Sequence, residues 1–99
     1  MVTYEFLNAV IYGMEAGKKR VKTPIDPEDQ LVKLGARIKA LRIKAGYNSY
    51  ETFAYEHGLP RAQYGRYEQG KDLRFSSLVK VVAAFSLTLE EFFQVGFQA

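Results

Sequence analysis

Glycines at positions 46, 58 and 70 divide the middle of this chain, and each follows a segment whose apolar residues recur at helical spacing. A glycine directly after such a segment is a common helix stop, because it adopts a left-handed backbone conformation without steric cost. Short helices joined by only a few residues pack against one another as a bundle. The sequence therefore predicts an all-α fold.

The segment between Asp26 and Gly46 predicts the longest helix. Asp26 can cap it and Pro27 suits its first position, while Glu28 and Asp29 place negative charge at the positive end of the helix dipole. Apolar residues repeat at steps of three and four down one face of this segment: Leu31, Leu34, Ile38, Leu41 and Ala45.

Shorter helices follow. Asn48 and Glu51 have the spacing of a capping box, which predicts a helix that ends at Gly58 and buries Phe53 and Ala54. A second short helix is expected over residues 60–69, and it stops at Gly70.

Two more helices are predicted near the end of the chain. Ser76 and Ser77 cap the first, and Thr88 caps a last short one that ends at Phe93. The first of these helices carries four apolar residues for the core, which are Leu78, Val81, Val82 and Phe85.

We divide the chain into residues 1–25, an amphipathic arm with a basic linker, and residues 26–97, a helical domain with an apolar tail. Apolar residues in the arm recur at helical steps and predict an extra helix, although a strand over residues 9–12 is the alternative. These residues are Tyr4, Leu7, Val10 or Ile11, and Met14. The linker GKKRVKT is either a solvated connector or an arm that touches phosphates.

Composition excludes several classes of site. The chain has no cysteine and a single histidine, His57, which excludes disulfides, thiol catalysis and the usual zinc sites. We find no nucleophile with its base, no phosphate-cradling glycine loop and no metal cluster, so we expect neither an enzyme nor a cofactor. The N-terminus is unlike a secretory signal and no run reaches the roughly 18 apolar residues of a membrane span, so we expect a cytoplasmic protein.

Positive charge is concentrated in the middle of the chain. The net charge is +3, but residues 33–74 carry nine basic groups against four acidic ones, a local balance of +5. A polyanionic partner is favoured there, and a solvated mixed-charge surface is the alternative.

Two short helices joined at Gly58 have the geometry of a helix-turn-helix, whose second helix can enter the major groove of DNA. At 100° per residue, Tyr64 and Tyr67 should pack inward from that helix. The opposite face should be a base-reading edge, formed by Arg61, Ala62, Gly65, Arg66 and Gln69.

The span from Leu34 to Phe93 resembles the XRE family of helix-turn-helix proteins, also called the phage-repressor or Cro type. The matching pieces occur in order as LGARIKALRIKAGY, ETFAYEHG, LPRAQYGRYEQGK and SSLVKVVAAFSLTLEEFF. The ending RYEQGK is the most specific of them. The resemblance implies a lambda-repressor-like bundle of about five helices, to which the N-terminal arm is an addition.

The resemblance also implies residue roles. It places base contacts at Arg61, Ala62 and Arg66, to which we add Gln63 and Gly65 from the same helix. It places contacts to the DNA backbone at Ser49, Tyr50, Gln69, Lys71 and Arg74, and a partly buried structural salt bridge between Arg42 and Glu68. The segment GYNSYETFA departs from the family by one apparent inserted residue, Tyr50 replaces a frequent glutamine, and Pro60 replaces the usual Ser or Thr cap.

The sequence thus predicts a sequence-specific regulator of transcription that binds double-stranded DNA as a homodimer. Apolar residues in excess of what a small core hides are the candidates for the dimer interface, namely Leu7, Ile11, Phe92, Phe93 and Phe97. The alternative is a protein-interaction adaptor, such as an antitoxin-like protein that grips a second protein partner.

Overall fold

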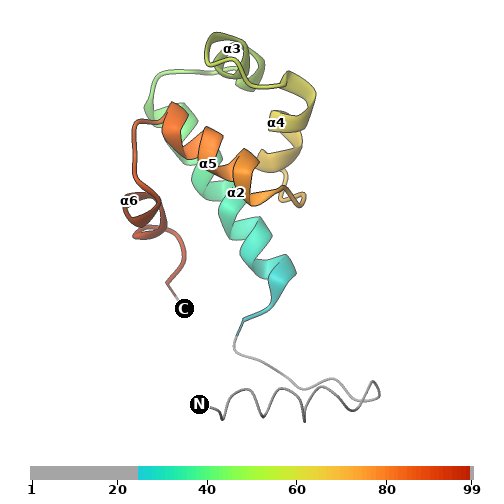
Figure 1. Ribbon diagram of the computed structural model, residues 1–99, viewed down its shortest axis with the longest axis vertical. Helices are drawn as coiled ribbons and strands as arrows, with labels where there is room; N and C mark the ends of the chain where they lie inside the picture. Colours follow the sequence, from blue (N-terminus) through green and yellow to red (C-terminus); the bar gives the residue numbers. More distant parts are fainter. Residues whose placement is uncertain (1–24, 99) are drawn as a thin grey trace.

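The computed structural model describes residues 25–98, and this part of the chain forms five α-helices and no strand (Figure 1). The all-α prediction is therefore confirmed. The arm predicted before residue 25, including Leu7 and Ile11, lies outside the described residues. The helices are α2 (Pro27–Lys44), α3 (Tyr50–Glu56), α4 (Arg61–Glu68), α5 (Phe75–Ala84) and α6 (Leu89–Phe93).

The ends of α2 follow the predicted local chemistry. The Asp26 carboxylate accepts a hydrogen bond from the backbone N–H of Asp29 at 3.3 Å, and Pro27 occupies the first turn. Beyond the last turn, Gly46 has a φ of +97°, a conformation that glycine adopts without strain. The start and the end of α2 were both predicted from the sequence.

The starts of α3 and α5 differ from the prediction. Ser49, not Asn48, caps α3, and its hydroxyl accepts from the N–H of Thr52 at 3.2 Å. The carbonyl of Asn48 instead accepts from the Arg42 guanidinium at 2.9 Å, which keeps Asn48 in the connection. α5 begins at Phe75 without a side-chain cap, and its N-cap residue is Arg74, which precedes the predicted serine cap Ser76–Ser77. α6 does begin with the predicted cap, in which Thr88 and Glu91 exchange hydrogen bonds of 2.9 and 3.1 Å.

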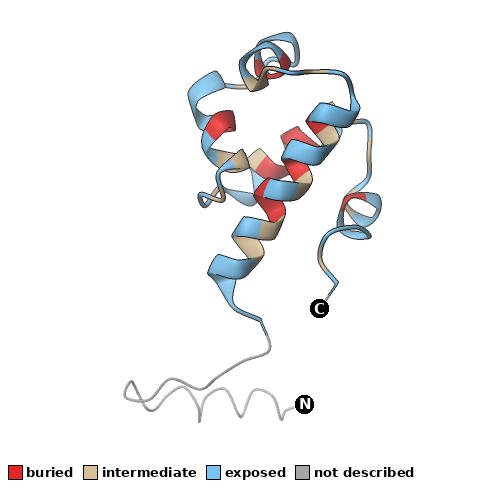
Figure 2. Ribbon diagram, turned by 180° about the vertical axis from the view of Figure 1, so that it is seen from behind, coloured by how far each residue is buried: buried red, intermediate tan, exposed pale blue. Residues whose placement is uncertain are grey.

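All five helices contribute buried residues to the apolar core, and these residues are red in Figure 2. Phe53 of α3 stacks on Phe85 with ring centroids 4.7 Å apart and lies 5.3 Å from the ring of Tyr64. The buried apolar residues are Leu34, Ile38, Phe53, Ala54, Tyr64, Leu78, Val81, Val82 and Phe92.

Phe92 belongs to this core, so its predicted place in an exposed dimer interface is wrong. Its ring is fully buried, and the Arg37 guanidinium of α2 lies over it at 5.4 Å. Arg37 also donates to the carbonyl oxygens of Phe92 at 2.8 Å and Glu91 at 3.3 Å. The Glu91 carbonyl also accepts from the backbone N–H of Gln94 at 3.3 Å. Arg37 therefore satisfies the Phe92 carbonyl at the end of α6 and joins α6 to α2.

α2 and α4 approach each other closely at Gly35. A Cβ atom built there would lie 2.7 Å from the carbonyl oxygens of Tyr67 and Glu68, which is inside the contact distance of real side chains. A residue without a side chain thus lets the backbone of α2 touch the end of α4. No helix between residues 25 and 98 is long and apolar enough to cross a membrane.

Candidate nucleic-acid interface

α4 presents two chemically different faces. Its inner face is buried or nearly so, and holds Tyr64, Gly65 and the carboxylate of Glu68. Its outer face is exposed to solvent and holds Arg61, Ala62, Gln63 and Arg66, with Gln69 directly after the helix. The prediction that these side chains lie on the exposed face of α4 is therefore confirmed for four of the five residues assigned to it.

A buried ion pair fixes the inner face. Two nitrogens of the Arg42 guanidinium donate to the two carboxylate oxygens of Glu68 at 2.8 and 3.0 Å. Its third nitrogen donates to the carbonyls of Tyr47 and Asn48 at 2.8 and 2.9 Å. The hydrogen bonds to Glu68 raise the pKa of Arg42. One side chain of α2 therefore orients α4 and the connection into α3 at the same time. The family resemblance implied the salt bridge between Arg42 and Glu68, and the structure contains it.

Tyr64 completes the inner face beside that ion pair. Its ring is fully buried, and its hydroxyl has no hydrogen-bond partner among the described residues. Burial raises the pKa of the Tyr64 phenol, because the phenolate would be desolvated. Tyr64 therefore acts as a packing residue with an unsatisfied polar atom.

Gly65 does not lie on the exposed face where the sequence analysis placed it. It is buried under the ring of Tyr50, and a Cβ atom at this position would lie 2.6 Å from Cε1 and 2.8 Å from Cζ of that ring. A covered residue offers no surface to a base, so we remove Gly65 from the base-reading set. Helical periodicity could not reveal this, since the covering side chain comes from another helix.

The outer face has donors without internal partners. No hydrogen bond or ion pair joins the side chains of Arg61, Gln63 and Arg66 to another residue between 25 and 98. Polar groups that are solvated and exposed in this way remain available to a partner. Guanidinium and amide groups suit paired acceptors, such as phosphate oxygens or the edges of bases.

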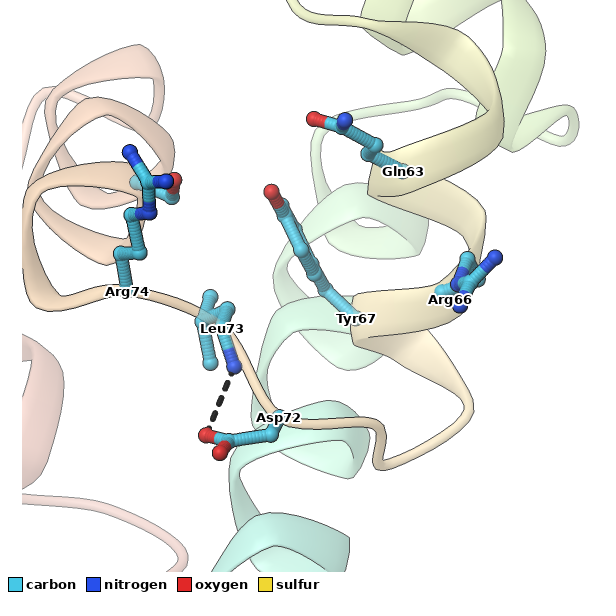
Figure 3. Close-up of a pocket in the computed structure, with 7 residues that line it drawn as sticks. Gln63, Arg66, Tyr67, Asp72, Leu73 and Arg74 are labelled. Carbon is cyan, nitrogen blue, oxygen red and sulfur yellow. Dashed lines mark hydrogen bonds between the residues drawn. The ribbon is translucent and has the colours of Figure 1, made fainter.

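A polar hollow of about 480 Å³ adjoins this face, between α4 and the start of α5. In Figure 3, Gln63 and Tyr67 point toward Arg74 across the hollow, whereas Arg66 points away from it. Its residues are Gln63, Arg66, Tyr67, Asp72, Leu73, Arg74 and Ser77.

Sequence reasoning missed the part that Tyr67 plays in this hollow. It placed Tyr67 inside with Tyr64, but Tyr67 is only half-buried. Gln63 and Tyr67 are four residues apart and thus lie above one another on a helix, which is the signal that could have placed them together. The hollow joins the outer face of α4 to the following loop.

The loop after α4 carries residues that were predicted to contact the DNA backbone. Lys71 and Arg74 are exposed, and the backbone N–H of Lys71 donates to the carbonyl of Arg66 at 3.1 Å. The Asp72 carboxylate accepts from the N–H of Leu73 at 2.8 Å (Figure 3). The bond from Lys71 to Arg66 holds the start of the loop against the end of α4, and Lys71 and Arg74 follow beside the outer face.

Ser49 and Tyr50, at the start of α3, were predicted to contact the DNA backbone, and both also have structural roles. The Ser49 hydroxyl caps the helix through Thr52, and Tyr50 covers Gly65. Both residues are half-buried, so each keeps only part of its surface for a partner. The part of the chain that the structure describes contains no group of three or more His, Asp or Glu side chains able to hold a metal ion.

The fold is similar to that of the restriction-modification controller protein C.AhdI from Aeromonas hydrophila, known from a crystal structure. The two share 33% sequence identity over 66% of this chain and 98% of the controller protein, with a TM-score of 0.58. No protein-family model matches the chain. No curated protein sequence matches it either.

Proposed function

The chain belongs to the helix-turn-helix family of that controller protein, and from this premise we propose that it is a transcriptional regulator of the XRE, phage-repressor type that binds double-stranded DNA. The observation that carries the proposal is the outer face of α4, where exposed donors without internal partners stand on a helix whose inner face is fixed. Such a helix suits insertion into the major groove.

Base selection is assigned to the outer face of α4. Arg61 and Arg66 can each donate two hydrogen bonds to a guanine, and Gln63 can pair with an adenine edge. Ala62 can contact the methyl group of a thymine. All four residues are exposed, which supports this role.

Contacts to the DNA backbone are assigned to the loop after α4. Lys71 and Arg74 supply positive charge, and Gln69 supplies an amide donor next to them. Replacing Lys71 with alanine should weaken binding to every duplex alike and lower the slope of log K against log salt by about one unit. Titrations at several salt concentrations measure this slope, and an unchanged slope would remove Lys71 from the contact set.

We also propose that the working form is a homodimer, since a two-fold pair of such helices suits a palindromic site. Of the predicted interface residues that the structure describes, Phe93 is exposed and Phe97 is half-buried, so these two remain candidates. Light scattering of the free protein and of its DNA complex measures the number of chains in each.

Enrichment of bound fragments from random duplex DNA tests the function directly. We expect an enriched motif with two inverted half-sites whose centres are about one or more helical turns, roughly 10 base pairs each, apart. We also expect retention on random duplex DNA that falls as salt rises. A protein that enriches no motif and is not retained at low salt would contradict the proposal, and would favour the adaptor alternative.

A further inference from the structure

A second hollow, on α2, is apolar. It has a volume of about 480 Å³ and lies between the first half of α2, the loop after α4 and the end of the chain. We call it the α2 groove, and its residues are Pro27, Gln30, Leu31, Leu34, Phe93 and Phe97, with Asp72 at the rim. It is separate from the polar hollow beside α4, with which it shares only Asp72.

The first turns of α2 extend beyond α4 and α5 in Figure 1, and Figure 2 shows them exposed or half-buried. In the same region Phe93 is 40% exposed, and its ring lies 4.9 Å from that of Phe97. Two aromatic rings and the leucines of α2 therefore face an apolar space that the described residues leave open. Covering such a surface would release water and stabilise the protein.

We propose that the N-terminal segment of the same chain, residues 1–24, docks in the α2 groove. Phe93 and Phe97 line this groove, so in this arrangement they contact the segment and are not available to a dimer partner. The sequence of the segment places Tyr4, Leu7, Ile11 and Met14 at steps of three and four, which gives one apolar face if the segment is helical. An apolar face and an apolar groove are complementary. The chain leaves this segment at Ile25 and reaches the rim of the groove at Pro27.

Connectivity favours this occupant over a free ligand. Met14 and Pro27 are 13 residues apart, which allows a span of up to roughly 45 Å at about 3.5 Å per residue, so the segment has ample reach. A short connection also gives a tethered group an effective concentration on the order of millimolar. Even a weak apolar contact is therefore formed within one molecule.

Charge complementarity supports the same placement. The connection between the apolar segment and α2 carries Lys18, Lys19, Arg20 and Lys22. Acidic groups are exposed beside the groove, with Glu28 and Asp29 in the first turn of α2 and Asp72 at the groove rim. Opposite charges on the two sides favour the docked arrangement at moderate salt.

The experiment uses the full chain, which contains no cysteine of its own. Glu5→Cys introduces one thiol for a nitroxide spin label, at a position that lies off the apolar face on a helical projection. In ¹⁵N-labelled protein we expect amide signals of Gln30, Leu31 and Leu34 to lose intensity, while those of Thr52 and Tyr55 on α3 keep theirs. Equal intensities in the two groups would overturn the proposal.

A matched pair of substitutions tests the apolar contact. In the labelled protein Leu7→Asp should restore the groove signals, because a carboxylate would enter an apolar site. Ala9→Asp adds the same charge to the opposite face and should leave the signal loss unchanged. Restoration by both substitutions, or by neither, would contradict docking through the apolar face.

A mixture of spin-labelled ¹⁴N protein and unlabelled ¹⁵N protein distinguishes docking within one chain from docking onto a second chain. We expect the groove signals in this mixture to keep their intensity, because the segment fills the groove of its own molecule. A loss of intensity in the mixture would assign the groove to a second copy and overturn the proposal. None of these measurements involves DNA, so the proposed function and the docking can fail independently.

Discussion

The two faces of α4 differ in how far the rest of the protein buries and binds their side chains. On the inner face, Glu68 is held by two hydrogen bonds from Arg42, and Tyr64 is fully buried. On the outer face, Arg61 and Arg66 are exposed and make no ion pair with another described residue. Changes to the inner face should therefore alter folding, whereas changes to the outer face should alter only what the protein binds.

The largest effect is expected from breaking the buried ion pair. Glu68→Ala leaves the Arg42 guanidinium buried without its carboxylate, which should cost about 3–5 kcal/mol of the free energy of unfolding. Urea denaturation measures this loss. Glu56→Ala removes an exposed carboxylate that bonds only to Tyr47 and serves as the control. Equal losses in the two variants would show that the inner face does not depend on this pair.

Gly35→Ala should cost about 1–3 kcal/mol, because its Cβ would meet backbone oxygens of α4 that have no freedom to rotate away. The sign of this change in stability is informative, because replacing glycine with alanine at an open position of a helix stabilises a protein by roughly 1 kcal/mol. Gly65→Ala is the comparison, because its new methyl group meets the movable end of the Tyr50 ring. Unfolding curves that rank Gly35→Ala as the milder change would contradict the close approach of α2 and α4.

On the outer face, Arg66→Ala should leave the unfolding curve unchanged. If Arg66 pairs with a guanine, the substitution should weaken binding to the enriched site by about 1–3 kcal/mol more than binding to random duplex. Lys39→Ala removes one exposed positive charge from α2 and is the control. Competition binding at fixed salt measures the difference, and equal weakening on both duplexes would assign Arg66 to backbone contacts.

The smallest effect at neutral pH is expected from Tyr64→Phe, which removes a hydroxyl that has no hydrogen-bond partner between residues 25 and 98 and should change stability little. The difference grows in alkali. Burial raises the pKa of Tyr64 in the folded state, so the protonated phenol stabilises the fold fully below its unfolded-state pKa near 10. As pH rises above that value, the free energy of unfolding falls by up to about 1.4 kcal/mol per pH unit.

Tyr64→Phe should therefore lose less stability than the parent protein between pH 9 and roughly 11, as unfolding in urea at each pH would measure. Tyr55→Phe removes a hydroxyl from a ring that is 75% exposed and should follow the parent protein. A parallel decline in the parent and Tyr64→Phe would show that this phenol ionises freely in the folded state.

Local chemistry made much of the fold predictable. Asp26, Gly46 and Thr88 act within one helical turn of themselves, so the sequence alone located the ends they form. The pair of Arg42 and Glu68 was found through family resemblance, since 26 positions separate its members.

The errors share a different cause. Gly65 is covered by Tyr50 from α3, and Phe92 is enclosed beneath Arg37 from α2. In both cases a side chain from another helix decides the exposure, and the periodicity within one helix carries no information about it. The same limit applies to Tyr67, which faces the hollow shared with the loop before α5.

At Gly35 the attachment of α4 is a contact between two backbones, and backbone atoms are common to all residues. The attachment thus does not depend on which side chains occupy positions 61, 62, 63 and 66. If these four side chains select bases, as proposed, a lineage that exchanges them can acquire a new target sequence while it inherits the scaffold intact. The same four positions are the natural ones to randomise in a library that seeks altered specificity.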